Sequence, residues 1–321
     1  MKKLLLWACI VLVCFSFFAC SGQGTSSGAA ASDGVAKQRI AVSLPPANNS
    51  WQAKIRQVID QAVLLHPDFE WTIKNAVDDD DQLNQLNIFL NDNYDAMIIL
   101  PGNGTLLTPI CERIYDSGCK TVILDRAIES SKYTALVMGD NYGCGVAAAR
   151  LLGKLLNGQG DIVALHSYTG IPIDVQRFDG FKDTLTKEFP GIRILVEGDG
   201  EFNREAGLRA MTNILPGYPH IDAVYTQDDE AALGALTAIN NARRDDIKYI
   251  TGMGGAKEAY ERFIAKDPIY VASMSYFPGQ GADGVEMAVR ILKGGTFPKD
   301  TVLGSVVVDS TNVHQFMNDA Y

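Results

Sequence analysis

Residues 135–156 read ALVMGDNYGCGVAAARLLGKLL, and this stretch decides the fold class. Its first five residues form a short apolar run of strand length, and residues 146–156 are apolar at helical spacing. Asp140 and Asn141 stand between the two, where the free N–H groups at the start of a helix need acceptors. The stretch therefore predicts a strand that passes directly into a capped helix, the repeating unit of a parallel sheet.

The same alternation of short apolar runs and amphipathic segments extends from residue 39 onward. One set of predicted strands ends at this helix and a second set follows it at similar intervals. We therefore expect an α/β protein with two similar doubly wound, Rossmann-like lobes, parallel sheets and a cleft between the lobes. The predicted strands are 39–44, 70–76, 95–100, 120–124 and 135–139, then 161–166, 193–197, 222–226, 248–252 and 269–274.

Composition and charge exclude one class of partner. The chain has 321 residues, 47% of them hydrophobic, so it can bury a sizeable core. Its 38 acidic and 28 basic residues give a net charge of −10. Because nucleic-acid binders neutralise phosphates with Lys and Arg, this charge would repel such a ligand. We therefore expect no nucleic-acid partner.

The N-terminal sequence is typical of an export signal. A basic pair precedes an apolar run over residues 4–19, which is shorter than the roughly 20 residues of a membrane span. We predict a signal peptide over 1–19 and a flexible tether, rich in Gly, Ser and Ala, over 20–37. The sequence Phe17-Phe18-Ala19-Cys20 resembles the lipobox of bacterial lipoproteins, which implies lipidation of Cys20. Cleavage without lipidation is the alternative.

Three cysteines follow the predicted tether, namely Cys111, Cys119 and Cys144. Their odd number and the lack of zinc-type spacing argue against a disulfide framework and against a metal site. A bridge between Cys111 and Cys119 stays open in an oxidising compartment. We favour the interpretation that all three are small buried hydrophobic residues.

The sequence motifs of common enzyme classes are absent. There is no G-x-S-x-G, no Walker motif, no H-E-x-x-H, and no G-x-G-x-x-G after the first predicted strand. His166 ends a predicted strand without a visible nucleophile. The acidic run 78–81 lacks calcium-loop spacing, and we interpret it as the capped start of a helix over 83–90. We expect a non-enzyme without cofactor or metal.

Ligands of open α/β sheets bind beyond the carboxyl ends of the strands, so residues at those ends form the candidate site. They combine aromatic rings, carboxylates, amides and a guanidinium, which suits a neutral ligand rich in hydroxyl groups. Local roles are the alternative: helix caps for Asp125 and Asp228, core packing for Trp51, a surface ion pair for Arg126. The candidate ligand-binding residues are Asn49, Trp51, Gln52, Asp125, Arg126, Asp174, Phe202, Asp228 and Ser275.

Several segments carry a family resemblance: IAVSLPPANNSWQAKI at 40–55, TVILDR at 121–126, GDNYGCGVAAARLLGKLL at 139–156 and DAVYTQDDEAALGALTAI at 222–239. Together they resemble the type I periplasmic sugar-binding proteins of the ribose- and galactose-binding kind, which are solute receptors of ABC importers. The resemblance covers nearly the whole chain after the tether. It implies a three-strand hinge between an N-terminal lobe and a C-terminal lobe, with the boundaries 38–139 plus 276–304 and 140–275 plus 305–321.

The resemblance also implies roles for individual residues. It implies polar sugar contacts on both lobes, stacking by Trp51 and an aromatic wall at Phe202. The polar contacts would come from Asn49, Asp125 and Arg126 on the N-terminal lobe and from Asp228 on the C-terminal lobe.

This sequence departs from the family pattern at several implied contacts. Asp228 replaces a common Asn, Gly254 a common Asp, and Ser275 a Gln or Asn. Val175 stands two residues before Arg177, where ribose binders have a contacting Arg. These departures leave the ligand's identity open, because each lost donor or acceptor would leave a particular hydroxyl unpaired.

The resemblance implies a lipid-anchored receptor that captures a monosaccharide, either a pentose, a hexose or a polyol, and delivers it to an ABC permease and ATPase. We expect a monomer on the extracytoplasmic face of a membrane, attached only through its lipid. One alternative is a sensory module that signals to a membrane kinase or chemoreceptor, and another is a secreted enzyme. Within the binding class, a nucleoside or an amine-bearing solute is an alternative ligand.

Overall fold

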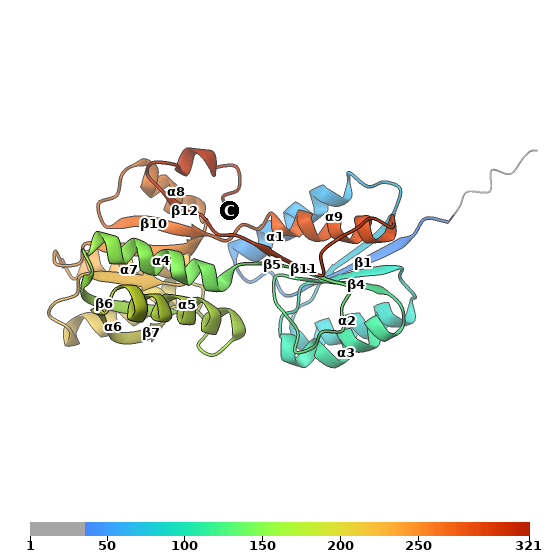
Figure 1. Cartoon of the computed structure of the whole chain (residues 1–321), viewed down its shortest axis with the longest axis horizontal. Coiled ribbons are helices and arrows are strands. Elements are labelled where there is room, and N and C mark those ends of the chain that lie inside the picture. The colour runs from blue at the N-terminus through green and yellow to red at the C-terminus, as the bar shows by residue number, and fades with distance from the viewer. Residues whose placement is uncertain (1–35) are drawn as a thin grey trace, which may run out of the picture. The chain divides into compact units, whose positions relative to one another are not determined.

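The computed structural model describes residues 36–321, which form two sheets (Figure 1). The first contains β1 (Arg39–Leu44), β2 (Glu70–Asn75), β3 (Ala96–Ile99), β4 (Lys120–Leu124), β5 (Ala135–Gly139) and β11 (Asp300–Leu303). The second contains β6 (Gln159–His166), β7 (Gly191–Asp199), β8 (Ala223–Thr226), β9 (Tyr249–Gly254), β10 (Tyr270–Ser275) and β12 (Val307–Asp309). Their strand orders are β11-β5-β4-β3-β1-β2 and β12-β10-β9-β8-β6-β7.

The predicted α/β fold with two doubly wound lobes is confirmed, with one correction. Strand β12 runs antiparallel to β10, so the second sheet is not wholly parallel. The sequence-based strands also omit β11 and β12, which have four and three residues. Such short edge strands carry too few alternating apolar positions to produce a recognisable period.

Helices cover both faces of each sheet, because successive strand residues point to opposite faces. In β1, Ile40 and Val42 pack in the cluster that includes α1 and α9, whereas Ala41 packs in the cluster that includes α2 and α3. The helices of this N-terminal lobe are α1 (Ser50–Val63), α2 (Asp79–Asn91), α3 (Gly104–Asp116) and α9 (Gln280–Leu292). Those of the C-terminal lobe are α4 (Asn141–Leu155), α5 (Pro172–Glu188), α6 (Arg204–Ile214), α7 (Asp229–Asn241) and α8 (Lys257–Ile264).

Acidic caps begin the helices where the sequence predicts them. Asp78 accepts the backbone N–H of Asp81 at the start of α2, at 2.7 Å, so the acidic run is a helix start. Asp140 accepts the N–H of Gly143 at 2.7 Å and caps α4. The strand–cap–helix interpretation of residues 135–156 is confirmed.

The chain passes between the two sheets after β5, after β10 and after β11. These segments bond to one another: the Asp140 N–H donates to the Leu303 carbonyl at 2.9 Å, and the Ser275 N–H donates to the Val306 carbonyl at 2.8 Å. The predicted lobe boundaries at 139/140, 275/276 and 304/305 fall in these three connections, and we keep them as proposed boundaries.

Cys111, Cys119 and Cys144 are free and buried, which confirms the interpretation as small hydrophobic residues. Burial raises the pKa of the Cys111 and Cys119 thiols to about 12. Thiols of this kind are unreactive at neutral pH.

The predictions for the N-terminal segment fall largely outside the part of the chain that the structure describes. The predicted signal peptide, Cys20 and nearly all of the predicted tether lie outside the described residues. Within residues 36–321, no helix combines the length and apolar character that a membrane crossing requires.

Two glycines bring α4 and α5 close together. A Cβ atom on Gly145 of α4 would collide with the backbone of Arg177 in α5, and one on Gly180 of α5 would collide with the carbonyl of Tyr142 in α4. The position of Arg177 therefore depends on backbone contact between the two helices.

We predict that Gly180→Ala lowers the free energy of unfolding by about 1–3 kcal/mol, because the added methyl group must push α5 away from α4. Gly217→Ala is the matched control, since a Cβ there meets no atom within 4 Å, and its effect should stay within about 0.5 kcal/mol. Urea unfolding of both variants measures the difference. Equal stabilities would show that the two helices can separate at no cost.

Candidate ligand-binding site

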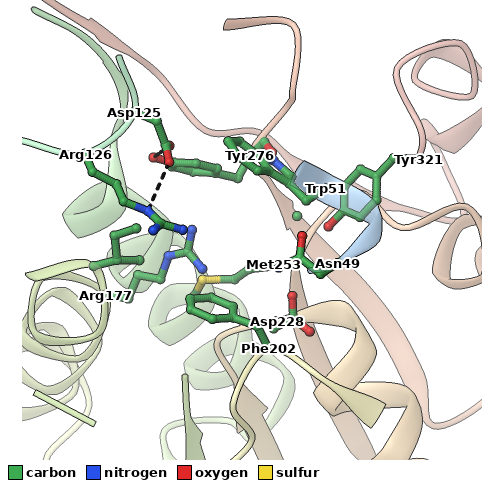
Figure 2. A pocket seen from close by; sticks show the side chains of 12 residues that line it. Asn49, Trp51, Asp125, Arg126, Arg177, Phe202, Asp228, Met253, Tyr276 and Tyr321 are labelled. Atoms are coloured by element: carbon green, nitrogen blue, oxygen red, sulfur yellow. Dashed lines mark hydrogen bonds and ion pairs between the residues drawn. The ribbon is translucent and has the colours of Figure 1, made fainter. Parts of the chain in front are cut away.

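One cavity lies at the carboxyl ends of strands from both sheets and collects side chains from the two lobes (Figure 2). The N-terminal lobe contributes the start of α1 and the residues after β4. The C-terminal lobe contributes α5, the loop after β7, the cap of α7 and the end of β9. The lining residues are Asn49, Trp51, Asp125, Arg126, Ile173, Arg177, Phe202, Asp228, Met253, Gly254, Tyr276 and Tyr321.

The start of α1 supplies an amide and an indole. Asn49 caps the helix with its Oδ1, which accepts the Gln52 N–H at 2.8 Å, and its Nδ2 is left to donate into the cavity. The Trp51 Nε1 donates to the Tyr276 carbonyl at 2.8 Å, and the two rings lie with centroids 6.0 Å apart. Trp51 is therefore a fixed aromatic wall, held by a residue of the connection after β10.

Asp125 follows β4 with a φ of +65°, a left-handed conformation that Asp and Asn adopt more readily than most residues. Its side chain is almost fully buried. Oδ1 accepts from the Tyr276 hydroxyl at 2.7 Å and from the Gln280 Nε2 at 3.0 Å. Oδ2 lies 3.5 Å from the Arg126 Nε, and the Arg126 Nη1 donates to the Gly102 carbonyl at 3.0 Å. Neutral donors and a guanidinium thus hold this carboxylate at the cavity wall.

Arg177 is a buried guanidinium on the opposite lobe. Its Nε donates to the Asn141 Oδ1 at 2.9 Å and its Nη1 to the Gln227 carbonyl at 2.7 Å. The guanidinium carbon lies 4.7 Å from the ring centroid of Tyr276 and 5.9 Å from that of Phe202. Neutral acceptors and aromatic faces therefore stabilise this cation, which leaves N–H groups to donate to a ligand.

Asp228 caps α7 and is the second carboxylate of the cavity. Its Oδ1 accepts the N–H groups of Glu230 and Ala231 at 2.8 and 3.1 Å, so Oδ2 is left for a ligand. Burial, followed by the charge of the neighbouring Asp229, raises the pKa of Asp228 to about 7. The carboxyl group therefore changes its protonation state near neutral pH.

Three of the predicted contact residues, Gln52, Asp174 and Ser275, do not line this cavity. The side chains of Gln52 and Ser275 accept hydrogen bonds from backbone N–H groups instead. The Gln52 Oε1 accepts the Asn48 N–H at 2.8 Å and closes the loop before α1. The Ser275 Oγ accepts the Val306 N–H at 2.8 Å and links two of the connections between the lobes.

Asp174 is the third of these residues, and it faces His166. The His166 Nδ1 lies 2.7 Å from the Asp174 Oδ1, and its Nε2 lies 3.2 Å from the Glu197 Oε2. Burial alone would raise the pKa of Asp174, but hydrogen bonds from His166 and the Gly170 N–H, together with the charge of His166, outweigh it and the pKa falls. The Asp174 Oδ2 also accepts the Gly170 N–H at 2.9 Å, so this carboxylate holds the loop before α5.

Six lining residues are absent from the sequence-based set: Ile173, Arg177, Met253, Gly254, Tyr276 and Tyr321. Arg177 stands one helical turn after Ile173, so the helical period could have placed both on one face. The family pattern directs attention to Val175 instead, which is exposed. Tyr321 carries no sequence signal, because it follows the last predicted strand by many residues.

The lining side chains can bind a ligand rich in hydroxyl groups. Two carboxylates can accept hydrogen bonds, two guanidinium groups and an amide can donate them, and aromatic rings from both lobes can cover C–H faces. When both carboxylates are ionised, their charges balance those of the two guanidinium groups, which fits an uncharged ligand. In the described part of the chain, no group of three or more His, Cys, Asp or Glu side chains is arranged to hold a metal ion.

The raised pKa of Asp228 predicts a pH dependence of stability without ligand. With a folded-state pKa of about 7 and an unfolded value near 3.9, the free energy of unfolding should fall between about pH 4 and pH 7 by on the order of 2–4 kcal/mol, because the native state holds the proton longer. Asp228→Asn keeps the cap and removes this loss, so its stabilising effect should be larger at pH 8 than at pH 5.

The control for this prediction is Asp78→Asn, which changes an exposed helix cap. Chemical unfolding at both pH values checks the difference. If Asp228→Asn changed the free energy of unfolding by the same amount at pH 5 and at pH 8, as we expect for Asp78→Asn, the raised pKa of Asp228 would be wrong.

Comparisons with known proteins agree on one family. The family described as "Periplasmic binding protein domain" matches residues 40–296. The ribose import binding protein of Bacillus subtilis is 26% identical over 251 residues, 78% of this chain and 81% of that protein. Among solved structures, the fructose-binding periplasmic domain of a hybrid two-component system is 29% identical with a TM-score of 0.79, covering 88% of this chain and 93% of that one. An ABC transporter solute-binding protein from Bacillus halodurans with bound myo-inositol is 26% identical with a TM-score of 0.81, covering 88% and 98%. The resemblance found in the sequence is thereby confirmed, and the chain belongs to the periplasmic binding protein domain family.

Proposed function

We propose that this protein binds a monosaccharide, either a pentose, a hexose or a polyol, between its lobes and delivers it to the permease and ATPase of an ABC importer. The observation that carries the proposal is the cavity in which carboxylates, guanidinium groups and aromatic rings of both lobes meet. Relatives named for ribose import and a neighbouring structure with bound myo-inositol support this ligand class.

Each lobe supplies one half of the proposed binding surface. On the N-terminal lobe, Asp125 accepts from a ligand hydroxyl, Arg126 donates to one, and Trp51 covers a C–H face. On the C-terminal lobe, Arg177 and Asp228 supply a donor and an acceptor. Hydrogen bonds to charged groups contribute about 1.5–3 kcal/mol each, so a few of them distinguish hydroxyl epimers.

Binding is coupled to lobe closure and needs no chemical step. A ligand that contacts both lobes stabilises the arrangement in which they approach each other, and this shifts the population toward that state. The transporter then recognises the closed form and receives the sugar unchanged.

A sensory role is the second candidate function. The similarity to the fructose-binding periplasmic domain of a hybrid two-component system supports it. In this role the same cavity and the same closure report ligand occupancy to a membrane kinase. The two functions differ in the partner of the closed form and share the ligand site.

We further propose that the protein is exported and held at the extracytoplasmic face of a membrane by a lipid on Cys20. The lipobox-like sequence Phe17 to Cys20 supports this proposal. At about 5–6 Å × √n, a tether of this composition lets the globular part move a few nanometres from the membrane surface.

A thermal-shift screen tests the ligand class. The panel is D-ribose, L-arabinose, D-fructose, D-allose, D-galactose, xylitol and myo-inositol, with adenosine and uridine as nucleosides. At least one sugar or polyol should raise the melting temperature, because a ligand that binds only the native state stabilises it. A response to the nucleosides alone, or to none of the compounds, contradicts the proposal.

Variants of the cavity locate the binding site. Arg126→Ala and Asp125→Asn should weaken binding of the responding sugar roughly 10- to 100-fold, because each removes a charged hydrogen-bond partner. Arg150→Ala is the control, since Arg150 is an exposed residue of α4 that pairs with Glu188 away from the cavity. Isothermal titration gives the affinities. Unchanged binding in both cavity variants would place the sugar elsewhere.

The lipid anchor has a separate test. Cys20→Ser should move the protein from the detergent phase to the aqueous phase in detergent partitioning of cells that express the full chain, because the serine hydroxyl does not replace the thiol as acceptor of the lipid. Ser26→Ala in the tether should leave the partitioning unchanged. If Cys20→Ser stays in the detergent phase, the anchor is not at this residue.

A further inference from the structure

Tyr321 lines the cavity although it lies beyond residues 40–296, the part of the chain that the family comparison matches. Its backbone is held beside the turn between β9 and α8: the Tyr321 N–H donates to the Gly255 carbonyl at 3.3 Å, and its carbonyl accepts the Lys257 N–H at 2.8 Å. The ring also packs against the apolar core of the C-terminal lobe. Tyr321 is therefore a fixed part of the wall.

The Tyr321 hydroxyl occupies space that a side chain at position 254 would otherwise fill. Gly254 ends β9 in the cavity wall with a φ of +126°. A Cβ atom built on Gly254 would collide with the Tyr321 hydroxyl oxygen. The absence of a side chain at position 254 is thus what admits the phenol to the cavity. In Figure 2 the phenol reaches inward from the side opposite Arg126 and Arg177.

The hydroxyl of Tyr321 is available for a ligand. It lies in the cavity wall, and burial and neighbouring charges are the largest influences on its pKa. Burial, and then the charges of Asp229 and Asp228, raise the pKa of the phenol, so it stays protonated at neutral pH. A neutral phenol both donates and accepts one hydrogen bond, and it can therefore pair with a ligand hydroxyl in either direction.

We propose that Tyr321 is a ligand-contacting, specificity-determining residue of the C-terminal lobe, whose hydroxyl takes the position that a side chain at residue 254 would otherwise fill. This inference rests on the proposed function, because it assumes a hydroxyl-bearing ligand in the cavity. Gly254 and Tyr321 then act as a pair: the glycine opens the space, and the phenol supplies the polar atom and an aromatic edge.

Tyr321→Phe tests the inference, because it removes the hydroxyl and keeps the ring. Isothermal titration with the seven sugars and polyols of the thermal-shift panel should show about tenfold weaker binding of those that the wild type binds, since one hydrogen bond to the ligand is lost. The melting temperature without sugar should stay within about 2 °C of the wild type, because the ring packing is preserved.

Tyr260→Phe is the matched control. Tyr260 is a buried phenol beside Gly255, at the same turn, with no partner for its hydroxyl among the described residues and no contact with the cavity. Loss of the Tyr260 hydroxyl should leave the affinities for all sugars and polyols of the panel unchanged. A second variant, Tyr321→Ala, should weaken binding further than Tyr321→Phe, because it also removes the aromatic edge.

The outcomes separate this inference from the proposed function. If the wild type binds a sugar and Tyr321→Phe binds it equally well, the role of Tyr321 is refuted while the proposed function stands. The same holds if Tyr260→Phe weakens binding as much as Tyr321→Phe does. If the wild type binds no compound of the panel, both proposals fall together.

Discussion

The hydrogen bond between the Tyr276 hydroxyl and the Asp125 carboxylate, at 2.7 Å, is the contact on which the cavity depends. Tyr276 follows β10, where the chain leaves the second sheet, and Asp125 follows β4 of the first. The same tyrosine accepts the Trp51 indole N–H on its carbonyl and offers its ring to the Arg177 guanidinium. One residue in a connection, through its hydroxyl and its backbone carbonyl, thus orients the carboxylate and indole of one lobe, and its ring contacts the cation of the other. The fit at Tyr276 is tight, because a Cβ atom on Gly139 in the adjacent connection would collide with its ring.

The electrostatic arrangement of the cavity follows from how each buried charge is stabilised. Asp125 is held by two neutral donors and one guanidinium, whereas Arg177 is held by neutral acceptors and aromatic faces. Asp228 accepts backbone N–H groups at the start of α7, but burial and an acidic neighbour raise its pKa to about 7. A ligand hydroxyl that donates to Asp228 favours the ionised form. Under the proposed function, binding of an uncharged sugar would therefore be coupled to the loss of a proton from this carboxyl near neutral pH.

The fold could be predicted from the sequence because strand and helix periods are local properties. The stretch 135–156 alone contains a strand, a cap and a helix, and the structure has all three there. The cavity was predictable where a residue stands directly beyond a strand, as Asp125 and Arg126 do, or caps a helix, as Asn49 and Asp228 do. Asp174 also lies near the start of a helix, in the first turn of α5. Its carboxylate pairs with His166, however, and strand or helix periodicity does not predict that contact. Tyr321 depends on tertiary packing against a glycine far away in sequence, which composition and spacing do not reveal.

The division of the binding groups between two lobes limits what kind of ligand can drive closure. A molecule that contacts only Asp125 and Arg126 gains nothing when the lobes approach, and it leaves their equilibrium unchanged however tightly it binds. A molecule that spans from Asp125 to Asp228 can hydrogen-bond to both lobes at once only in the closed state. Its higher affinity for the closed state than for the open state is then the driving force for closure. Hydroxyl groups on opposite sides of a small ring meet this requirement, because one face can reach each lobe. Both proposed functions, transport and sensing, would use the same ligand-driven closure, so we expect the difference between them to lie on the outer surface of the lobes.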